Sequence, residues 1–238
     1  MLKSFSYDIL KDMKDLFLQN GIEISDEQYE KFEKYYELLT FYNEKFNITA
    51  ITEKQEVFIK HFLDSVINLK KLTSGKLIDV GSGGGFPAIP IKIMNSNLQV
   101  FLLEATGKKC QFLNEVIKEL NLSNAQVINN RAEVLAKDLG FREQFDYCTA
   151  RAVARLNTLS EYCLPFVKVG GEFIAHKGDA KSEILEAKRA FEILGAKVIN
   201  CQEFELFGAK RTIITLKKVK STPEKYPRGN GKERKNPL

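Results

Sequence analysis

The clearest chemical pattern in this chain is the stretch DVGSGGGFPAIPI, residues 79–91. The apolar run KLIDV that leads into it predicts a buried strand, and the pattern after it is helical. Gly81, Gly83 and Gly85 would let the backbone turn tightly and approach a ligand where a Cβ would clash. The helix that follows would present unpaired N–H groups and its positive dipole end to that ligand. The stretch therefore predicts a nucleotide-type binding loop.

Two features favour S-adenosylmethionine over a dinucleotide as that ligand. The dinucleotide fingerprint is G-x-G-x-x-G, whereas the glycines here give G-x-G-G-G. A carboxylate two positions before the first glycine would repel a pyrophosphate and attract the ammonium group of a nucleoside that carries an amino acid. The next predicted strand ends in a glutamate, where these folds place a ribose-binding acid. We expect cofactor contacts from Asp79, Gly81, Ser82, Gly83, Gly85 and Glu104.

Three basic residues follow other predicted strands, at the ends where such folds bind ligands. Arg131 follows the third strand, Arg151 the fourth and Lys177 the fifth. Because the carboxyl ends of parallel strands lie along one edge of a sheet, these side chains would converge on one rim and suit an anionic group. The alternative is three solvated loop residues. We interpret the three as candidate catalytic and substrate-binding residues.

Two further segments, NITAI and HFLDS, precede the glycine loop. His61 and Asp64 of HFLDS are three residues apart, so a helix would place them on one face. A surface or core pair explains this spacing as well as a functional site does. Asn47 begins NITAI and also an N-x-T triplet. In a cytoplasmic protein that triplet is not a glycosylation site, and the simplest interpretation of Asn47 is a turn residue.

From residue 76 onward the sequence alternates between strand and helix patterns. This alternation predicts a parallel sheet with right-handed crossovers and helices on both faces. The short segment 206–210 between the last two strands predicts an antiparallel hairpin. We therefore predict an α/β fold of the Rossmann-like class I methyltransferase type, with a seven-stranded, mostly parallel sheet and a terminal antiparallel hairpin. Strands are expected at 76–80, 99–104, 125–129, 145–150, 171–176, 197–204 and 211–217, and helices at 88–95, 107–120, 155–168 and 180–194.

The sequence before residue 75 carries helix signals and no strand signal. Apolar residues at helical spacing predict a helix over 5–18. Ser25 with Gln28, and Thr52 with Gln55, match capping boxes that would open two more helices. We predict three parts of the chain: an N-terminal helical extension over 1–74, an S-adenosylmethionine-binding methyltransferase domain over 75–219, and a basic flexible tail over 220–238.

Composition limits the class of protein. The chain has 238 residues, 44% of them hydrophobic, and no apolar run of 18 residues that could span a membrane. Its N-terminus is an amphipathic pattern rather than a signal peptide. The four cysteines lack metal-type spacing and are expected to be reduced and buried, and with only two histidines no metal site is expected. These features predict a soluble cytoplasmic protein with no membrane or metal partner, acting as a monomer.

The excess positive charge is concentrated at the C-terminus. From Lys217 to the end there are eight Lys or Arg against two Glu, whereas the rest of the chain has 28 bases and 29 acids. Low hydrophobicity, high charge and several Pro and Gly predict that this tail is mobile. It suits salt-sensitive contact with an RNA phosphate backbone. The alternative is a tail that only improves solubility.

Taken together, several segments are very similar to the bacterial 16S rRNA guanine-N7 methyltransferases, the RsmG or glucose-inhibited division B family. The resemblance covers nearly the whole chain in the right order. It is carried by NITAI, HFLDS, DVGSGGGFPAIPI, LLEATGKKCQFL, RAE, ARAVARL, GGEFIAHKG and the ending KYPRGNGKERKNPL. It implies an S-adenosylmethionine-dependent enzyme that methylates N7 of one guanine in the decoding-region loop of 16S rRNA, with naked rRNA or the small ribosomal subunit as partner.

The resemblance also implies roles for individual residues. Gly81 and Phe86 match the cofactor loop of the family, and Ala132 and Glu133 match the segment that holds the adenine ring. Arg151 matches an arginine at the cofactor and substrate pocket. Arg131 and Lys177 match basic residues associated with rRNA binding or catalysis. The matched segments also make Asn47, His61 and Arg228 expected substrate contacts.

The chemistry implied by the resemblance needs no catalytic base, because guanine N7 carries a lone pair and no proton. Rate would come from holding N7, methyl and sulfur in line and from electrostatics. Other classes stay open at this point. An rRNA-binding assembly factor would need no intact cofactor pocket, a small-molecule methyltransferase would need no basic tail, and an NAD-dependent dehydrogenase would bind a nicotinamide cofactor.

Overall fold

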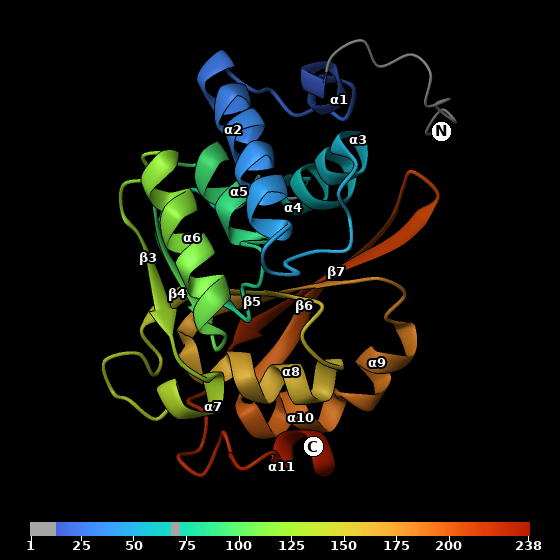
Figure 1. Ribbon diagram of the computed structural model, residues 1–238. Coiled ribbons are helices and arrows are strands. Elements are labelled where there is room, and N and C mark those ends of the chain that lie inside the picture. The colour runs from blue at the N-terminus through green and yellow to red at the C-terminus, as the bar shows by residue number, and fades with distance from the viewer. Residues whose placement is uncertain (1–12, 68–71) are drawn as a thin grey trace.

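A seven-stranded sheet forms the centre of the protein, in a computed structural model that describes residues 13–67 and 72–238. The strand order is β3-β2-β1-β4-β5-β7-β6 (Figure 1). The order reverses between β1 and β4, which is the topological switch point where open sheets of this kind bind ligands. The strands are β1 (Gly75–Val80), β2 (Leu98–Glu104), β3 (Ala125–Asn129), β4 (Phe145–Arg151), β5 (Val167–Lys177), β6 (Ala196–Leu206) and β7 (Ala209–Lys218).

The strand pairing confirms the predicted fold class. The first five strands are parallel to their neighbours, whereas β7 runs antiparallel to both β5 and β6. β6 and β7 form the expected hairpin, closed by Phe207 and Gly208, which both have positive φ. Most strands are longer than their sequence patterns predicted, and β5, β6 and β7 differ most. β6 and β7 extend because their backbone pairing continues to the hairpin turn, and β5 begins earlier because Val167 pairs with Phe145 of β4.

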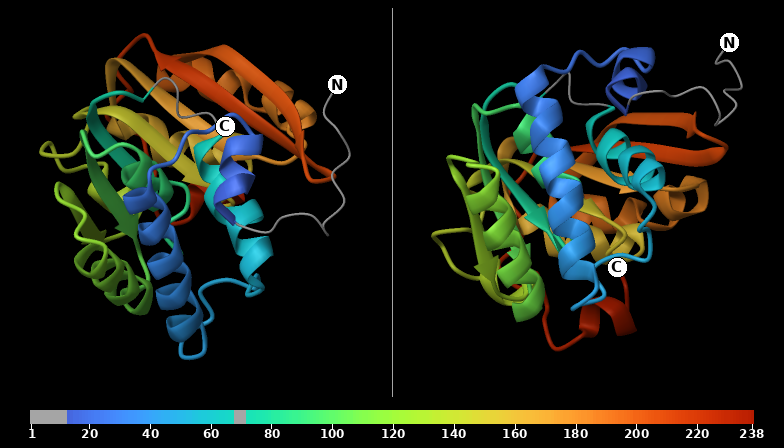
Figure 2. Two further views of the ribbon diagram at one scale, coloured as in Figure 1. Left: turned by 90° about the horizontal axis from the view of Figure 1, so that it is seen from above. Right: turned by 45° about the horizontal axis from the view of Figure 1, so that its top comes forward.

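Helices cover both faces of the sheet and divide the core into two clusters (Figures 1 and 2). One cluster joins the sheet to helices from the first half of the chain: α1 (Met13–Gln19), α2 (Asp26–Asn43), α3 (Lys54–Val57), the π-helix η2 (Phe58–Leu63), α4 (Asp64–Val66), α5 (Ala88–Met94) and α6 (Gly107–Glu119). The other joins it to later helices: α7 (Ala132–Leu135), α8 (Leu156–Cys163), α9 (Lys181–Glu186) and α10 (Lys188–Leu194).

The N-terminal helices pack directly onto the glycine loop. The capping box of Ser25 and Gln28 is confirmed at the start of α2. The one expected at Thr52 is wrong, because the chain stays extended through Glu53 and α3 begins at Lys54 without a side-chain cap. The predicted helix over 5–18 lies partly outside the described residues, and its described part is α1. Among the aromatic residues of α2, Phe32 and Tyr35 are fully buried in the core.

The C-terminal segment, residues 220–238, is packed against the protein, so the prediction of a flexible tail is wrong. Tyr226 is 7% exposed and belongs to the second core cluster. The Arg142 guanidinium donates to the carbonyl groups of Thr222, Pro223 and Tyr226. A short helix, α11 (Lys232–Lys235), lies near its end. The low average hydrophobicity of residues 220–238 gave no sign of this packing, because a few buried contacts are enough to order a segment.

Two sequence expectations about the rest of the chain can be compared with the described residues. Cys110, Cys148 and Cys163 are buried as expected, but Cys201 is exposed on β6, the edge strand of the sheet, most of whose residues are exposed. All four are free thiols. Within residues 13–67 and 72–238, no helix is long and apolar enough to cross a membrane, and no group of three or more His, Cys, Asp or Glu could hold a metal ion.

Candidate active site

The glycine loop after β1 has the conformation that its sequence predicts. Gly81 has a φ of +73°, and a Cβ there would lie 2.7 Å from Cγ2 of Val153. Gly85 has a φ of +91°, and a Cβ there would lie 2.5 Å from the Tyr35 hydroxyl. That hydroxyl donates a hydrogen bond to the carbonyl of Gly84. Both glycines are therefore required by backbone conformation and by close packing.

The amide groups of this loop are used within the protein. Gly81 and Ser82 donate to the carbonyl of Leu103, at 2.8 and 3.1 Å, and Gly85 donates to the carbonyl of Ser82 at 2.7 Å. A phosphate-binding loop works differently, because it points its amides at the ligand. The geometry thus agrees with the sequence argument against a pyrophosphate ligand and favours a nucleoside that carries an amino acid.

Asp79 lies beneath the loop with one oxygen available to a ligand. Its side chain is fully buried, and Oδ1 accepts a hydrogen bond of 2.8 Å from the Thr149 hydroxyl. Oδ2 is buried and has no hydrogen-bond partner in the part of the chain that the structure describes. Burial raises the pKa of Asp79 to about 7, against the lowering effect of the Thr149 hydrogen bond. An orphaned buried carboxylate oxygen fits an ammonium group supplied from outside the chain.

Asp79→Asn should make the ligand-free protein less sensitive to pH and weaken cofactor binding. The pKa of Asp79 is higher in the folded protein than the ordinary 3.8, so the folded state holds this proton more tightly. The stability of the wild type should therefore fall as pH rises from about 4 to 7, by on the order of 4 kcal/mol for three pKa units. Asparagine can still accept from Thr149 and carries no buried charge.

Melting curves without cofactor at pH 5, 6, 7 and 8 would measure the effect on stability, and calorimetric titration of S-adenosylmethionine at pH 8 would measure affinity. The variant should melt at least as high as the wild type at pH 8 and bind the cofactor at least tenfold more weakly. Equal affinity in wild type and variant would show that Asp79 does not contact the ligand.

Glu104 closes the loop from the end of β2. Its Oε2 accepts from the Gly83 amide at 2.9 Å and its Oε1 from the Thr106 amide at 2.8 Å. The side chain is 7% exposed. Because each carboxylate oxygen has two lone pairs, Glu104 can still accept hydrogen bonds from ribose hydroxyls at this strand end. Ala132 and Glu133 begin α7 beyond the neighbouring strand β3 and are both half-buried.

Arg151, the last residue of β4, joins the N-terminal helices to the loop. Its Nη1 donates to the Lys60 carbonyl at 3.1 Å and lies 3.4 Å from Oδ2 of Asp64. Its Nη2 lies 3.0 Å from Nδ1 of His61, and the guanidinium stands 5.1 Å from the centre of the Phe86 ring. The His61 ring also stacks on the Phe86 ring, with 4.4 Å between the ring centres. One arginine therefore fixes both HFLDS and the cofactor loop.

The contacts of His61 define its protonation. Nδ1 of His61 lies 3.0 Å from Nη2 of Arg151 and 3.2 Å from the Lys60 carbonyl, and these two neighbours call for opposite roles of Nδ1. We assign Nδ1 as the acceptor because the arginine is nearer and can only donate, which leaves the proton on Nε2, 2.8 Å from the Thr49 hydroxyl. Burial, and secondarily the charge of Arg151, lowers the pKa of His61 to about 3. His61 is therefore neutral at physiological pH. It lies in η2, a π-helical turn of a kind that often marks functional sites.

A pocket of about 390 Å³ opens beside this cluster. Its charged lining consists of four cations and two carboxylates: Lys60, Arg151, Lys177 and Arg211 against Asp64 and Glu183. His176 also lines it, and burial, followed by the charge of Arg151, lowers the pKa of that imidazole to about 3. The lining residues therefore carry two excess positive charges at physiological pH, and Glu56, which pairs with Lys60 outside the lining, offsets one of them. The pocket suits a group with several hydrogen-bond acceptors, such as a phosphate or the N7 and O6 edge of guanine.

The predicted convergence of three cations is correct for two of them. Arg151 and Lys177 both line the pocket, and Lys177 is held by Glu183 at 2.8 Å and by the Ala154 carbonyl at 2.9 Å. The prediction is wrong for Arg131, whose side chain is 73% exposed and lies 3.8 Å from Glu133. β3 is separated from β4 by two other strands, about 14 Å at ordinary strand spacing.

Two expected substrate contacts also lie apart from the pocket lining. Asn47 is exposed, while the following residues of NITAI cover the site, with Ile51 in the pocket wall and Thr49 bonded to His61. Arg228 is bound to Glu161 of α8, with Nη2 at 2.7 Å from Oε2 and Nε at 2.9 Å from Oε1. The Arg228 side chain is thus a structural partner of a buried acid.

The structure adds residues to the site that sequence reasoning did not single out. Arg211 on β7 holds both oxygens of Asp64 with its Nε at 3.0 Å, so Asp64 is shared between two arginines. His176 lies beside Arg151 in the β4–β5 register. The His61 and Asp64 spacing was noticed, but only the fold shows that both contact Arg151. Arg211 lies near the start of β7, which is antiparallel to β5, so it stands beside the carboxyl end of β5, where Lys177 pairs with Thr212. The predicted antiparallel hairpin could therefore have located it.

The arrangement places a hydrogen-bonding pocket for an acceptor-rich group next to a loop shaped for an amino-acid-bearing nucleoside. M. jannaschii TYW2, solved in complex with AdoMet, has a similar fold, with a TM-score of 0.52 and 16% identity, covering 66% of this chain and 77% of that one. The fold is that of S-adenosylmethionine-dependent methyltransferases, which is the class that the loop and its acids indicate.

Comparison of sequences assigns the chain within that class. Residues 28–214 match the model of the family described as GidB, rRNA small subunit methyltransferase G, and the chain belongs to this family. It is similar to ribosomal RNA small subunit methyltransferase G of Acetivibrio thermocellus, at 48% identity over 225 residues covering 92% of each chain. The protein of the same name in Clostridium beijerinckii is 45% identical, over 98% of each chain.

Proposed function

We propose that the protein transfers the methyl group of S-adenosylmethionine to N7 of one guanine in the decoding-region loop of 16S rRNA. The carrying observation is that a pocket with excess positive charge meets the cofactor loop at one place, where Arg151 stands over Phe86. Family membership and the names of the relatives, which are rRNA small subunit methyltransferases, support the same substrate class.

Residues along three neighbouring strand ends, those of β1, β2 and β3, would hold the cofactor. Asp79 would accept the ammonium group through its unpartnered Oδ2, and Glu104 would accept the ribose hydroxyls. Gly81 and Phe86 would contact the methionine and nucleoside parts of the cofactor. Ala132 and Glu133 would flank its adenine ring at the end of β3. When bound, S-adenosylmethionine supplies a sulfonium methyl group to an attacking atom.

The residues of the pocket would orient the guanine for this attack. N7 and O6 are neighbouring acceptors on one edge of the base, and Arg151 is a planar donor at the junction of pocket and loop. With O6 or a flanking phosphate held by Arg151 and Lys177, N7 can lie in line with the methyl group. The new C–N bond forms as the C–S bond breaks, its electron pair stays on sulfur, and the base gains the positive charge. No proton moves, so no general base is required.

The neutral histidines and the paired cations have a further consequence for product release. A methylated guanine is cationic, and the pocket keeps a net positive charge at physiological pH even though His61 and His176 are neutral, because its cations outnumber its carboxylates. Repulsion between the product and the pocket would therefore favour release. We propose in addition that the protein acts as a monomer and, because its substrate is rRNA, in the cytoplasm.

Transfer of labelled methyl from S-adenosylmethionine to RNA tests the proposal. The acceptors are 16S rRNA and small subunits from cells that lack this protein, with 23S rRNA as the control. Label in 16S rRNA or in small subunits, and not in 23S rRNA, is the expected result. Tight cofactor binding with no label in any RNA would contradict the RNA substrate and indicate a small-molecule acceptor.

A further inference from the structure

We propose that the C-terminal segment, residues 220–238, is a preformed docking surface for RNA phosphates, held rigid beside the active site by a buried ion pair. The inference rests on the proposed RNA substrate and goes beyond it, because it assigns that RNA a second contact surface outside the pocket lining. The segment was expected to be mobile, and its order is the observation that calls for an explanation. The segment is ordered by a buried charge pair, although burying charges is costly, and its outer side is strongly basic. An ordered basic surface of this kind is suited to binding a polyanion.

The anchor of this segment is the pair of Glu161 and Arg228. Glu161 is fully buried in α8, and Arg228 contacts it with its backbone amide at 2.8 Å and with its guanidinium at 2.7 Å. The same guanidinium donates to the Asn236 carbonyl at 2.8 Å, which closes the segment into a loop. Arg228 therefore ties both ends of the loop to one acid of the domain.

A second set of contacts fixes the segment on α8. Glu233 is fully buried, and its carboxylate accepts from the Gly229 amide. The Glu233 carbonyl accepts from the Thr158 hydroxyl at 2.9 Å. These contacts turn the neighbouring side chains of α11 outward, where Lys232, Arg234 and Lys235 are exposed.

The outer face of the segment is basic and is not neutralised by ion pairs. No salt bridge to any residue in the described ranges involves Lys220, Lys225, Lys232, Arg234 or Lys235. Glu224 is the single exposed acid of the segment. Its other acid, Glu233, is buried, so the cations dominate the exposed side. A regular chain of phosphates is the partner whose charge and spacing match such a face.

Helix α8 connects this face to the active site. The Leu156 amide at its start donates to Oε2 of Glu183 at 2.8 Å, and the same oxygen also pairs with Lys177 in the pocket. Thr158, two residues later, holds the C-terminal segment. Figure 1 shows α11 beside α8 and α10, below the helices of the first half of the chain. The buried start of α8 therefore contacts both the C-terminal segment, through Thr158, and a residue of the pocket, through Leu156.

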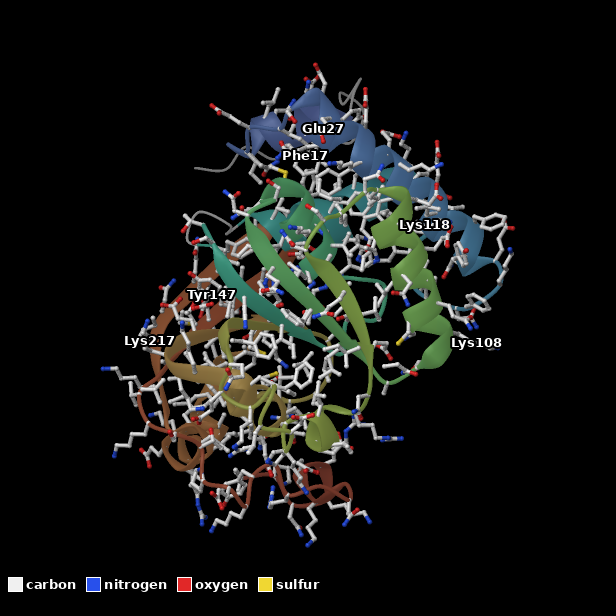
Figure 3. All side chains as sticks on the ribbon, turned by 90° about the vertical axis from the view of Figure 1, so that its left-hand side faces the viewer. Phe17, Glu27, Lys108, Lys118, Tyr147 and Lys217 are labelled. Atoms are coloured by element: carbon white, nitrogen blue, oxygen red, sulfur yellow. The ribbon has the colours of Figure 1, made fainter. Side chains whose placement is uncertain are left out.

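The test compares two triple variants that remove the same net charge. The first is Lys232→Ala with Arg234→Ala and Lys235→Ala. The control is Lys31→Ala with Lys34→Ala and Lys118→Ala, on α2 and α6. Figure 3 shows Glu27, the ion-pair partner of Lys31, and Lys118 far from the C-terminal segment at the opposite end of the molecule. Binding to 16S rRNA is measured from 50 to 300 mM salt, together with melting temperature and affinity for S-adenosylmethionine.

The α11 variant should raise the RNA dissociation constant about tenfold at 150 mM salt and reduce the magnitude of the salt slope by about 2. Its melting temperature and cofactor affinity should match the wild type, and the control variant should keep wild-type RNA binding. An unchanged slope, or the same loss in both variants, would overturn the inference. So would loss of binding to phosphatidylglycerol vesicles with RNA binding intact, which would assign the face to a membrane. Because binding is measured without methyl transfer, failure of the proposed reaction would be seen separately.

Discussion

Replacing Arg151 by alanine should lower the rate of methyl transfer by about 100-fold or more at saturating RNA and cofactor. Arg151 bridges the pocket, the cofactor loop and the N-terminal helices through the Lys60 carbonyl, His61 and the Phe86 ring. Its loss would release the base edge from the position that brings N7 into line. A displacement of about 1 Å at the reacting atoms is enough for an effect of this size.

Arg151→Lys is the matched control for this prediction. Lysine keeps the charge near Asp64 but loses the planar set of donors that reaches several partners at once. It should recover cofactor affinity more than it recovers rate. Melting temperature should fall modestly in both variants, because Asp64 retains Arg211. Unchanged methylation by Arg151→Ala would contradict the assigned role.

Replacing Arg228 by alanine should cost the protein about 3–5 kcal/mol of unfolding free energy. The change leaves Glu161 buried without its cation and removes the contacts that close the C-terminal segment. Arg155→Ala is the control, since Arg155 and Glu186 form an exposed pair, 60% and 48% accessible, that should contribute less than about 1 kcal/mol.

A double variant separates the buried charge from the rest of the effect. Glu161→Gln combined with Arg228→Met removes both charges and should recover much of the stability that Arg228→Ala loses. Urea unfolding of all variants at one pH and salt concentration is the measurement. A loss from Arg228→Ala no larger than that from Arg155→Ala would show that the pair does not hold the segment.

The elements near the glycine loop were predictable because local sequence determines them. The loop could be predicted from its glycines, which positive φ and close packing require at these positions. The strands could be predicted from short apolar runs that lie between helical patterns. The terminal hairpin followed from a connection too short for a helix. In each case the decisive residues are neighbours in the chain.

The parts that sequence reasoning missed depend on contacts between distant residues. Arg151 and His61 are 90 positions apart, and Arg211 meets Asp64 across 147 positions. The order of the C-terminal segment depends on Glu161, a helical residue whose sequence gives no sign that it is fully buried. Arg131 follows a strand end as the other cations do, and only the strand order shows that it lies apart. Charge and composition alone could not reveal these pairings.

The most direct test of the central claim is the position of the methyl group on RNA. Small subunits from cells lacking this protein would be methylated in vitro, and the 16S rRNA would then be cleaved chemically at N7-methylguanine and mapped by primer extension. Cleavage at one guanine in the decoding-region loop, present with the wild type and greatly reduced with Arg151→Ala, is the predicted result. Incorporated methyl without any N7 cleavage, or cleavage at many guanines outside that loop, would contradict the account.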